Sequence, residues 1–196
     1  MIDPLARLLE ERRRAAENND PVAGLCWAAN VDAGEAQVRT LVLRELDGRL
    51  ALFLNALSPK WHSWQAQTLP LALYLPTLSL QYRLRCRVEA IDAGTVHASW
   101  QQRPPVPKQL DWLYPRRPQS GAIESRQQLI DELSELGFPE VAPEHAAGLY
   151  LHPFEIDRLD LGTDNGVHDR RLYRLQDPHD AGPQGVRNWS ETVLVP

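Results

Sequence analysis

The sequence predicts a mainly β (α+β) protein, an antiparallel β-barrel with a few peripheral helices. About seven strand-like segments follow one another along the chain, and hairpin-type turns join several of them. Helix-like segments are few and lie at the beginning and in the middle of the chain. With 196 residues, of which 43% are hydrophobic and 24% charged, the chain suits one soluble globular domain. We therefore expect a single domain over 1–196, with a helix in 1–19 and the barrel in 20–196.

The first elements are a helix and a strand. Asp3-Pro4 supplies a helix cap followed by a proline at the first helical position, and leucines then repeat at the spacing of one helical face. This helix is expected over 4–17. The next segment, 23–31, is apolar and is typical of a strand.

A β-hairpin comes next. Asp47-Gly48 is typical of a type I′ turn, and strand-like segments at 38–46 and 49–55 flank it. The following helix is expected to begin at Pro59 and to end near Thr68. A short apolar strand then covers 71–75.

The clearest strand, 80–91, alternates apolar and polar side chains. Its apolar positions are Tyr82, Leu84, Cys86 and Val88, and its polar positions are Gln81, Arg83, Arg85, Arg87 and Glu89. The pattern predicts that one face of this strand lies in the core and that the other face is solvated.

The second half of the chain contains two more helices and the last strands. A short helix is expected at 95–102, and the proline-rich segment 104–118 is expected to be an ordered loop because it also carries aromatic residues. Ser125 and Gln128 have the spacing of a capping box, which predicts the start of a further helix. The remaining strands are predicted at 146–161, 167–175 and 191–195.

Charge and composition exclude several classes of partner. The net charge of −5 does not favour non-specific binding to nucleic acid or to an anionic membrane. No apolar run approaches the ~20 residues of a membrane span, and the first residues lack the plan of a secretory signal. Cys26 and Cys86 fall in apolar strand patterns, as buried thiols of a reducing compartment do. We expect a cytoplasmic protein that binds neither nucleic acid nor membrane.

The segment Ser58-Pro59-Lys60 predicts a phosphate site. Serine suits the cap of the following helix, proline suits its first position, and the free amide groups at a helix start attract anions. Lys60 adds a full positive charge. Arg39 and Arg44 bracket the strand upstream, and the chain can fold back so that Arg39 and Lys60 meet around a phosphate. Considered alone, the two arginines would be solvated strand ends.

Other chemistries find less support. The six histidines are scattered without the spacing of metal ligands, so no metal site is predicted. No pattern of a Ser or Cys nucleophile or of a dinucleotide-binding glycine loop occurs. The arginines of 80–91 could mark an RNA-binding barrel, but that face has no interleaved aromatic residues and is better explained as solvated. Any difficult chemistry is therefore expected to come from a cofactor.

Six motifs and the chain end occur in a family-specific order. They are Arg39-Thr-Leu-Val-Leu-Arg44, Asn55-Ala-Leu-Ser-Pro-Lys60, Gln81-Tyr-Arg-Leu-Arg-Cys-Arg-Val-Glu89, Arg103-Pro104, Gln119-Ser120 with Ser125-Arg126, His168-Asp-Arg170, and the ending with Trp189 and Leu194-Val-Pro196. In this order the chain resembles the pyridoxamine 5′-phosphate oxidase family of FMN-binding split β-barrel proteins, as a divergent branch, over residues 20–196.

The resemblance implies an antiparallel split β-barrel that binds FMN at the two-fold interface of a homodimer and passes hydride from a small substrate to the flavin. The cofactor-binding residues that it implies are Arg39, Thr40, Leu41, Ser58, Lys60, Gln81, Gln119, Ser120 and Arg170. Of these, Arg39, Lys60, Gln119 and Ser120 would hold the phosphate, and Gln81 and Arg170 would touch the ring. The substrate-binding residues that it implies are Arg44, Arg103 and His168, and His168 is also the implied catalytic residue.

The chain departs from the family pattern at several substrate positions. Gly166 stands where the family has an arginine, and Ser99 and Pro107 stand where it has a tyrosine and a serine. Pro59 replaces a basic residue, and the flavin-side tryptophan falls near 159–160. The resemblance therefore supports FMN binding more strongly than it supports pyridoxamine or pyridoxine 5′-phosphate as the substrate. The alternative function is a non-catalytic FMN carrier or redox sensor.

Overall fold

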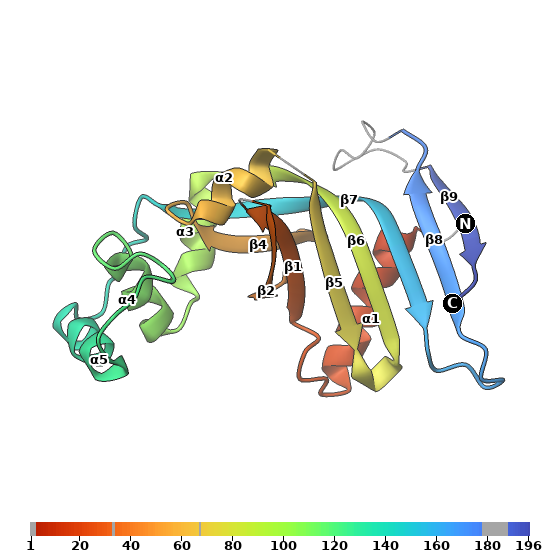
Figure 1. The fold of residues 1–196 in the computed structure, drawn as a ribbon, viewed down its shortest axis with the longest axis horizontal. Coiled ribbons are helices and arrows are strands. Elements are labelled where there is room, and N and C mark those ends of the chain that lie inside the picture. Colours follow the sequence, from red (N-terminus) through yellow and green to blue (C-terminus); the bar gives the residue numbers. More distant parts are fainter. Residues whose placement is uncertain (1–2, 33, 67, 178–187) are drawn as a thin grey trace. The chain divides into compact units, whose positions relative to one another are not determined.

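The computed structural model describes residues 3–32, 34–66, 68–177 and 188–196 (Figure 1). The chain divides into two compact units. The first unit comprises Met1–Leu52, Trp64–Glu89 and Tyr150–Pro196, and the second comprises Phe53–Ser63 and Ala90–Leu149. The expectation of one domain stays a prediction. No helix of the described ranges is both long and apolar enough to cross a membrane.

The first unit is built on a curled, mostly antiparallel sheet (Figure 1). Its strands are β1 (Leu25–Asp32), β2 (Glu35–Val42), β3 (Arg44–Leu46), β4 (Arg49–Asn55), β5 (Leu69–Leu75), β6 (Leu80–Ala90), β7 (Ala146–Asp160), β8 (Asp169–Leu175) and β9 (Trp189–Leu194). The strand order is β2-β1-β5-β6-β7-β4-β3, while β8 pairs with β7 and β9 with β8. The last residues of β4 and the first of β7 belong to the second unit. The predicted class, mainly β with peripheral helices, is confirmed.

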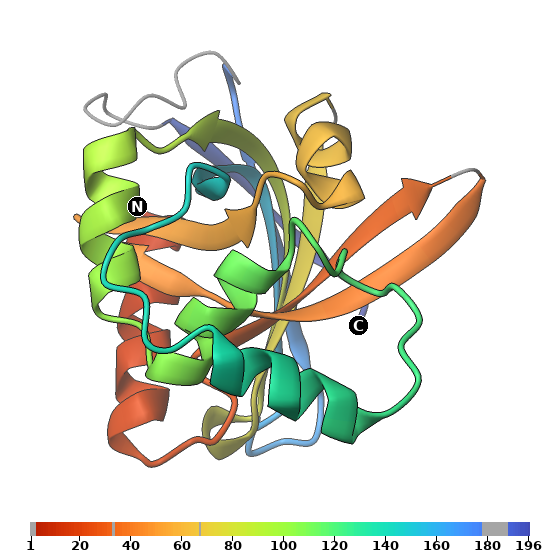
Figure 2. The ribbon, with the colours of Figure 1, turned by 90° about the vertical axis from the view of Figure 1, so that its left-hand side faces the viewer.

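Two hairpins shape one side of the sheet. Figure 2 shows β1 and β2 as a long paired ribbon, which runs in register from Leu25 opposite Val42 to Asp32 opposite Glu35. Between β3 and β4, Asp47 and Gly48 have φ angles of 52° and 71°, as the predicted type I′ turn requires.

The predicted strand 38–46 is two strands in the structure. The chain leaves β2 at Leu43, whose side chain is 2% exposed and whose amide donates to the Gly24 carbonyl oxygen at 2.9 Å. An apolar strand pattern could not reveal this break, because burying one more leucine does not disturb the alternation.

The core of the first unit lies between the inner face of the sheet and helix α1 (Pro4–Glu17). The helix has the predicted bounds, and its cap Asp3 accepts the Leu5 amide at 2.8 Å. The predicted alternation of β6 is confirmed, since Tyr82, Leu84 and Cys86 are buried. Burial raises the pKa of the neighbouring Cys26 thiol to about 12, so this group stays protonated.

The second unit carries most of the remaining helices, α3 (Ala93–Gln101), α4 (Pro105–Leu113) and α5 (Arg126–Glu135). The expected loop over 104–118 is wrong, because its first half is α4. The prolines that suggested a loop stand in the first turn of this helix, where no amide donor is needed. The predicted cap of α5 is confirmed, as Ser125 Oγ accepts the Gln128 amide at 3.1 Å.

Two short elements complete the chain. Helix α2 (Pro59–Ala66) begins where the sequence predicts and crosses from the second unit into the first. A single 3₁₀ turn, η1 (Pro76–Leu78), joins β5 to β6, and α1 contacts it.

Candidate functional site

The predicted phosphate-binding strand β2 turns Arg39 toward the inner face of the sheet. Arg39 lies directly opposite Ala28 on β1, and Ala28 is fully buried. Thr40 points to the other face, opposite Trp27, and Leu41 points inward opposite Cys26. This alternation follows from the two-residue period of a strand.

Arg39 retains donor capacity for an anion. One of its terminal nitrogens, Nη2, donates to Gln37 Oε1 at 2.7 Å. Its Nε is buried and has no hydrogen-bond partner within the described ranges. A buried N–H without an acceptor is destabilising, and a phosphate oxygen would satisfy it. Arg39 therefore fits the group that the sequence analysis assigns to it.

The turn before α2 is held by its own hydrogen bonds to Asn55. Ser58 is 6% exposed and directly precedes the helix. Asn55 Oδ1 accepts the Leu57 amide at 2.8 Å, and the Ser58 amide donates to the Asn55 carbonyl oxygen at 3.0 Å. Ser58 and Lys60 belong to the second unit and Arg39 to the first. Their convergence on one phosphate stays a prediction.

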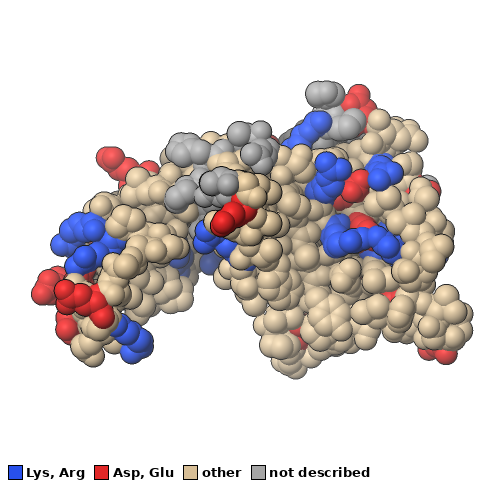
Figure 3. All heavy atoms as spheres, viewed as in Figure 1, with Lys and Arg blue, Asp and Glu red and all other residues tan. Residues whose placement is uncertain are grey.

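The structure brings the two predicted ring-contacting residues to one face of the first unit. Gln81 and Arg83 are two residues apart on β6, on its outer face. Arg83 donates to Asp157 of β7, and Arg170 of β8 donates to the same carboxylate from Nε at 3.2 Å and from Nη2 at 2.9 Å. Asp157 thus links the strand that carries Gln81 to Arg170. Figure 3 shows basic and acidic side chains intermixed over β6 to β8.

Asp157 is held in its charged form. It is 8% exposed, and this burial by itself raises its pKa. The hydrogen bonds from Arg170 and Arg83 outweigh burial and hold the pKa below its usual value. Two guanidinium groups against one carboxylate leave the cluster with an excess positive charge.

A groove of about 460 Å³ lies beside this cluster in the first unit. Its lining residues are Trp27, Ala29, Val38, Pro70, Leu71, Ala72, Arg83, Leu84, Arg85, Glu155 and Asp157. A mostly apolar lining with a few charged groups is typical of ligand-binding surfaces. The groove and Arg39 lie on opposite faces of β2, because Val38 and Arg39 are consecutive in the strand.

His168 is exposed at the end of the loop that joins β7 to β8. Asp169, the first residue of β8, follows it directly and is paired with Arg171. In the same loop Gly166 has a φ of 72°, a conformation that favours glycine. His168 directly precedes β8, and Arg170 is the second residue of that strand, opposite Leu159 near the end of β7. His168 and Arg170 are therefore close in the chain at this end of β7.

The remaining predicted residues are dispersed. Arg44 is half-buried at the start of β3 in the first unit. Arg103, in the second unit, donates to Asp111 at 2.6 Å. Gln119 is half-buried and Ser120 is exposed in the loop between α4 and α5, where Ser120 has a φ of 65°. Whether these residues act with Arg39 and Arg170 stays a prediction.

Sequence reasoning missed the acidic residues that hold the predicted cations. Asp157 holds Arg170, and Asp111 holds Arg103 while also accepting from Trp100 Nε1 at 2.8 Å. The signal for Asp157 was the charge pattern of Glu155-Ile-Asp157-Arg158-Leu-Asp160, which places Glu155 and Asp157 on one face of the strand and Arg158 with Asp160 on the other. Within the described ranges, no three His, Cys, Asp or Glu side chains are grouped as a metal site requires.

Two curated relatives are similar to this chain in sequence. A pyridoxine/pyridoxamine 5′-phosphate oxidase of Pseudomonas fluorescens (strain SBW25) is 33% identical over 157 residues, which cover 76% of this chain and 71% of the relative. A pyridoxine/pyridoxamine 5′-phosphate oxidase of Legionella pneumophila (strain Lens) is 32% identical over 166 residues, which cover 80% of this chain and 74% of the relative. No protein-family model matches the chain.

Two solved structures are similar in fold. PhzG from Burkholderia lata 383, in complex with tetrahydrophenazine-1-carboxylic acid, has a TM-score of 0.79 at 18% identity and covers 99% of this chain and 93% of its own. A pyridoxamine 5′-phosphate oxidase-related, FMN-binding protein from Nostoc punctiforme PCC 73102 has a TM-score of 0.70 at 21% identity and covers 94% of each chain. At these identities the likeness concerns the fold, and it confirms the predicted split β-barrel.

Proposed function

The chain belongs to the pyridoxine/pyridoxamine 5′-phosphate oxidase family, and we propose that it is an FMN-dependent oxidoreductase that takes hydride from a small substrate. The observation that carries this proposal is that Asp157 binds both Arg170 and Arg83, which lies on the same outer face of β6 as Gln81. When bound, FMN supplies the hydride acceptor, which no side chain can provide.

The phosphate of FMN is assigned to Arg39, Ser58 and Lys60, with Thr40 and Leu41 beside it on β2 and with Gln119 and Ser120. Support comes from the buried Nε of Arg39, which has no hydrogen-bond partner in the described chain. A second support is the position of Ser58 directly before α2, because the first amides of a helix have no partner within it. Together these groups would give charge-assisted hydrogen bonds to a dianion.

Gln81 and Arg170 are assigned to the flavin ring. Arg170 carries a fixed positive charge, and its bidentate pairing with Asp157 orients the guanidinium. A fixed cation beside the ring stabilises negative charge that develops there. Gln81 adds an amide that can donate or accept at the ring edge.

A second copy of the chain is proposed as the partner that completes the site. Arg39 faces inward opposite the buried Ala28, whereas Gln81 faces outward opposite the exposed Tyr74. One small ligand that touches both sets therefore requires the inner face of one sheet and the outer face of another. The outer face of β2 also exposes Val38 and Val42, by 67% and 58%, as a contact surface does.

The substrate is assigned to Arg44, Arg103 and His168. The two arginines favour an anionic substrate, and His168 would lie against its ring and act in the reaction. Gly166 leaves no guanidinium where the family pattern has one, so pyridoxine and pyridoxamine 5′-phosphate are candidates rather than assigned substrates. The cytoplasm is the proposed location.

The visible spectrum of the purified protein, together with the mass of the molecule that it releases, tests the cofactor. A flavin spectrum and the mass of FMN are expected. Anaerobic mixing with pyridoxine 5′-phosphate, pyridoxamine 5′-phosphate and reduced aromatic acids then tests turnover, and bleaching of the flavin is expected with at least one of them.

A non-catalytic FMN carrier or redox sensor is the second candidate function. The same phosphate residues serve it, and the loss of a guanidinium at Gly166 favours it. A broad panel of amines, alcohols and nicotinamides tests this candidate. If none of them reduces the bound FMN, the result supports a carrier or sensor.

A further inference from the structure

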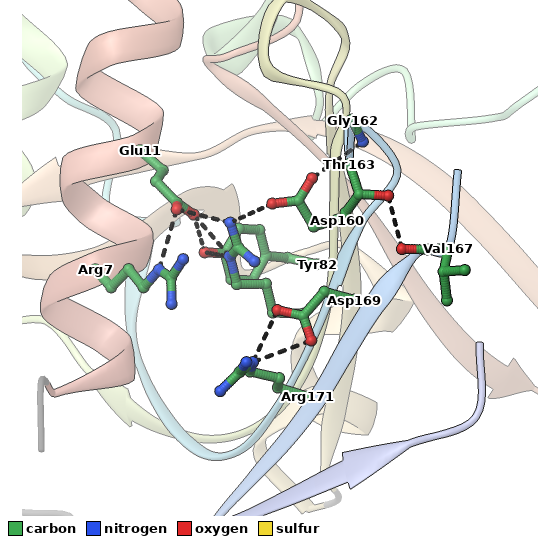
Figure 4. Close-up of polar contacts among 10 residues, drawn as sticks. Arg7, Glu11, Tyr82, Asp160, Gly162, Thr163, Val167, Asp169 and Arg171 are labelled. Carbon is green, nitrogen blue, oxygen red and sulfur yellow. Dashed lines mark hydrogen bonds and ion pairs between the residues drawn. The ribbon is translucent and has the colours of Figure 1, made fainter. Parts of the chain in front are cut away.

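A buried ion network connects helix α1 to the strand that leads into the His168 loop. Glu11 of α1 and Arg158 of β7 are 6% and 3% exposed. Arg158 Nη2 donates to Glu11 Oε1 at 3.0 Å, and Arg158 Nε donates to Glu11 Oε2 at 3.2 Å. The Tyr82 hydroxyl donates to the same carboxylate, and Figure 4 shows Glu11 and Tyr82 pointing toward one another. Such pairing is required, because a lone charge at this depth is strongly destabilising.

Asp160 extends this network into the loop. Its Oδ2 accepts from Arg158 Nη2 at 3.1 Å, and its Oδ1 accepts the amide of Gly162 at 3.0 Å. Figure 4 shows Asp160 between the Glu11 cluster and Gly162. One carboxylate therefore joins an immobilised guanidinium to the loop backbone.

The loop is internally bonded from that point to the residue before His168. The bonds within the loop are Thr163 Oγ1 to Val167 O at 2.6 Å, Gly166 N to Thr163 O at 3.2 Å and Val167 N to Asn165 Oδ1 at 3.0 Å. At the start of the loop, Leu161 N also donates to Ser79 O, which lies just before β6, at 2.9 Å. Asp160 fixes the beginning of this bonded segment, and His168 follows its end.

We propose that Asp160 and Arg158 are positioning residues for His168, and that helix α1 takes part through Glu11. This inference rests on the proposed function, in which His168 lies against the substrate. An exposed histidine on a loop has many accessible positions, and a reaction requires one of them. The network restricts the loop at its beginning, through Asp160. Neither Glu11 nor Arg158 has to contact His168 for this effect.

Hydrogen exchange of the full-length protein tests the tether directly. Asp160→Ala removes both bonds, while Asp160→Asn keeps an acceptor for the Gly162 amide. Asp164→Ala is the matched control, because Asp164 is exposed in the same loop. We expect amide exchange in 161–168 to rise roughly tenfold in Asp160→Ala, to rise less in Asp160→Asn, and to stay at the wild-type rate in the control. Wild-type exchange in both Asp160 variants would overturn the proposal.

Glu11→Gln tests whether α1 contributes to holding the loop. It removes the charge that holds Arg158 while leaving every residue of the loop in place. Glu10→Gln is its control, since Glu10 is its exposed neighbour and pairs with Arg13 at the surface. Faster exchange in 161–168 is expected for Glu11→Gln alone. Exchange in 161–168 that stays slow in a folded Glu11→Gln protein would show that α1 does not help to hold the loop.

Kinetics distinguish positioning from simple stabilisation. With a substrate that reduces the flavin, Asp160→Ala is expected to lower kcat roughly 10- to 100-fold while KM and flavin content change little, and Asp160→Asn is expected to restore part of the rate. A loosened loop with unchanged kcat would contradict a positioning role. If the wild-type protein holds no flavin, the proposed function fails, whereas the exchange experiment still decides whether Asp160 holds the loop.

Discussion

At the scale of single residues, Arg39 and Lys60 are expected to carry the affinity for the FMN phosphate. Arg39→Ala and Lys60→Ala should each weaken FMN binding by about 1–3 kcal/mol, because each removes a charge-assisted contact. Titration of the apoprotein by fluorescence quenching measures the effect. Arg13→Ala is the control, since Arg13 is an exposed arginine of α1 that pairs with Glu10. Unchanged affinity in both test variants would contradict the phosphate assignment.

His168 is expected to act on the substrate and not on the cofactor. His168→Ala should therefore leave FMN affinity unchanged and lower the rate of flavin reduction roughly 100-fold. Stopped-flow absorbance of the flavin band gives the rate, and the apoprotein titration gives the affinity. A loss of flavin from this variant would mean that the histidine contacts the cofactor.

Glu11 is expected to make stability depend on acid pH. Burial raises its pKa, but hydrogen bonds from Arg158 and Tyr82 and the charge of Arg158, with a contribution from Arg7, lower it below the usual 4.5. A carboxyl whose pKa is lowered by folding stabilises the fold above its unfolded pKa, and this stabilisation is lost as the pH falls through the folded value.

The matched measurement is urea unfolding of the wild type and of Glu11→Gln. At pH 7 the variant is expected to lose about 3 kcal/mol, because Arg158 loses its main partner. Below pH 4.5 the difference should begin to shrink, and the two proteins should converge once the pH has fallen through the lowered pKa of Glu11 in the folded protein, where Glu11 is neutral as well. A difference that stays constant down to pH 3 would refute the assignment of the charged carboxylate.

The cations assigned to the proposed site could be named from the sequence, whereas the acidic groups that hold some of them could not. Arg39, Lys60 and Arg170 stand in local motifs, which a single stretch of chain is enough to reveal. Asp157 meets Arg170 only because β7 and β8 pair in the sheet. Glu11 meets Arg158, 147 residues away in sequence, only because α1 packs near β7. A local charge pattern marks Asp157 as a strand position but does not say which distant residue it binds, so both pairings became apparent only in the structure.

At the scale of elements, the strand β7 is expected to tolerate no side chain at Gly148. A Cβ at this position would lie 2.8 Å from Ile91 Cδ1 and 3.2 Å from Phe53 Cδ1, all within the second unit. Gly148→Ala should therefore destabilise the protein by about 1–3 kcal/mol. Thermal unfolding measures the change.

Gly24→Ala is the control for this substitution. A Cβ there meets no heavy atom within 4 Å, so no loss of stability is expected. Equal unfolding temperatures for the two variants would show that the Ile91 and Phe53 side chains move aside without loss of stability. Gly148 would then not be required for the packing of β7.

Most elements could be predicted from the sequence because their signals are local. The bounds of α1 and β4 follow from a cap, a proline and a turn that lie next to them. The helix α4 was missed because Pro105 and Pro107 were taken as signs of a loop, although both lie in a first turn that needs no amide donors. The choice between loop and helix depended on Gln109, Asp111 and Leu113, which become buried only in the folded unit.

At the scale of the whole molecule, we propose that two copies of the chain build the FMN site. Arg39, assigned to the phosphate, and Gln81, assigned to the ring, face opposite sides of one sheet. The sequence resemblance implied a dimer, and the register of β1 with β2 and of β5 with β6 gives a physical reason for it. Sequence periodicity alone could not supply that reason, because it does not say which face of one strand joins which face of the next.

Mixing two defective variants tests the shared FMN site most directly. Arg39→Ala and Arg170→Ala are unfolded together, refolded and titrated with FMN, beside each variant alone. Each mixed dimer contains one site with both arginines, so random pairing is expected to restore tight binding at about a quarter of all sites. A mixture that binds FMN no better than either variant alone, although both pair with wild-type chains, would contradict a site built from two copies.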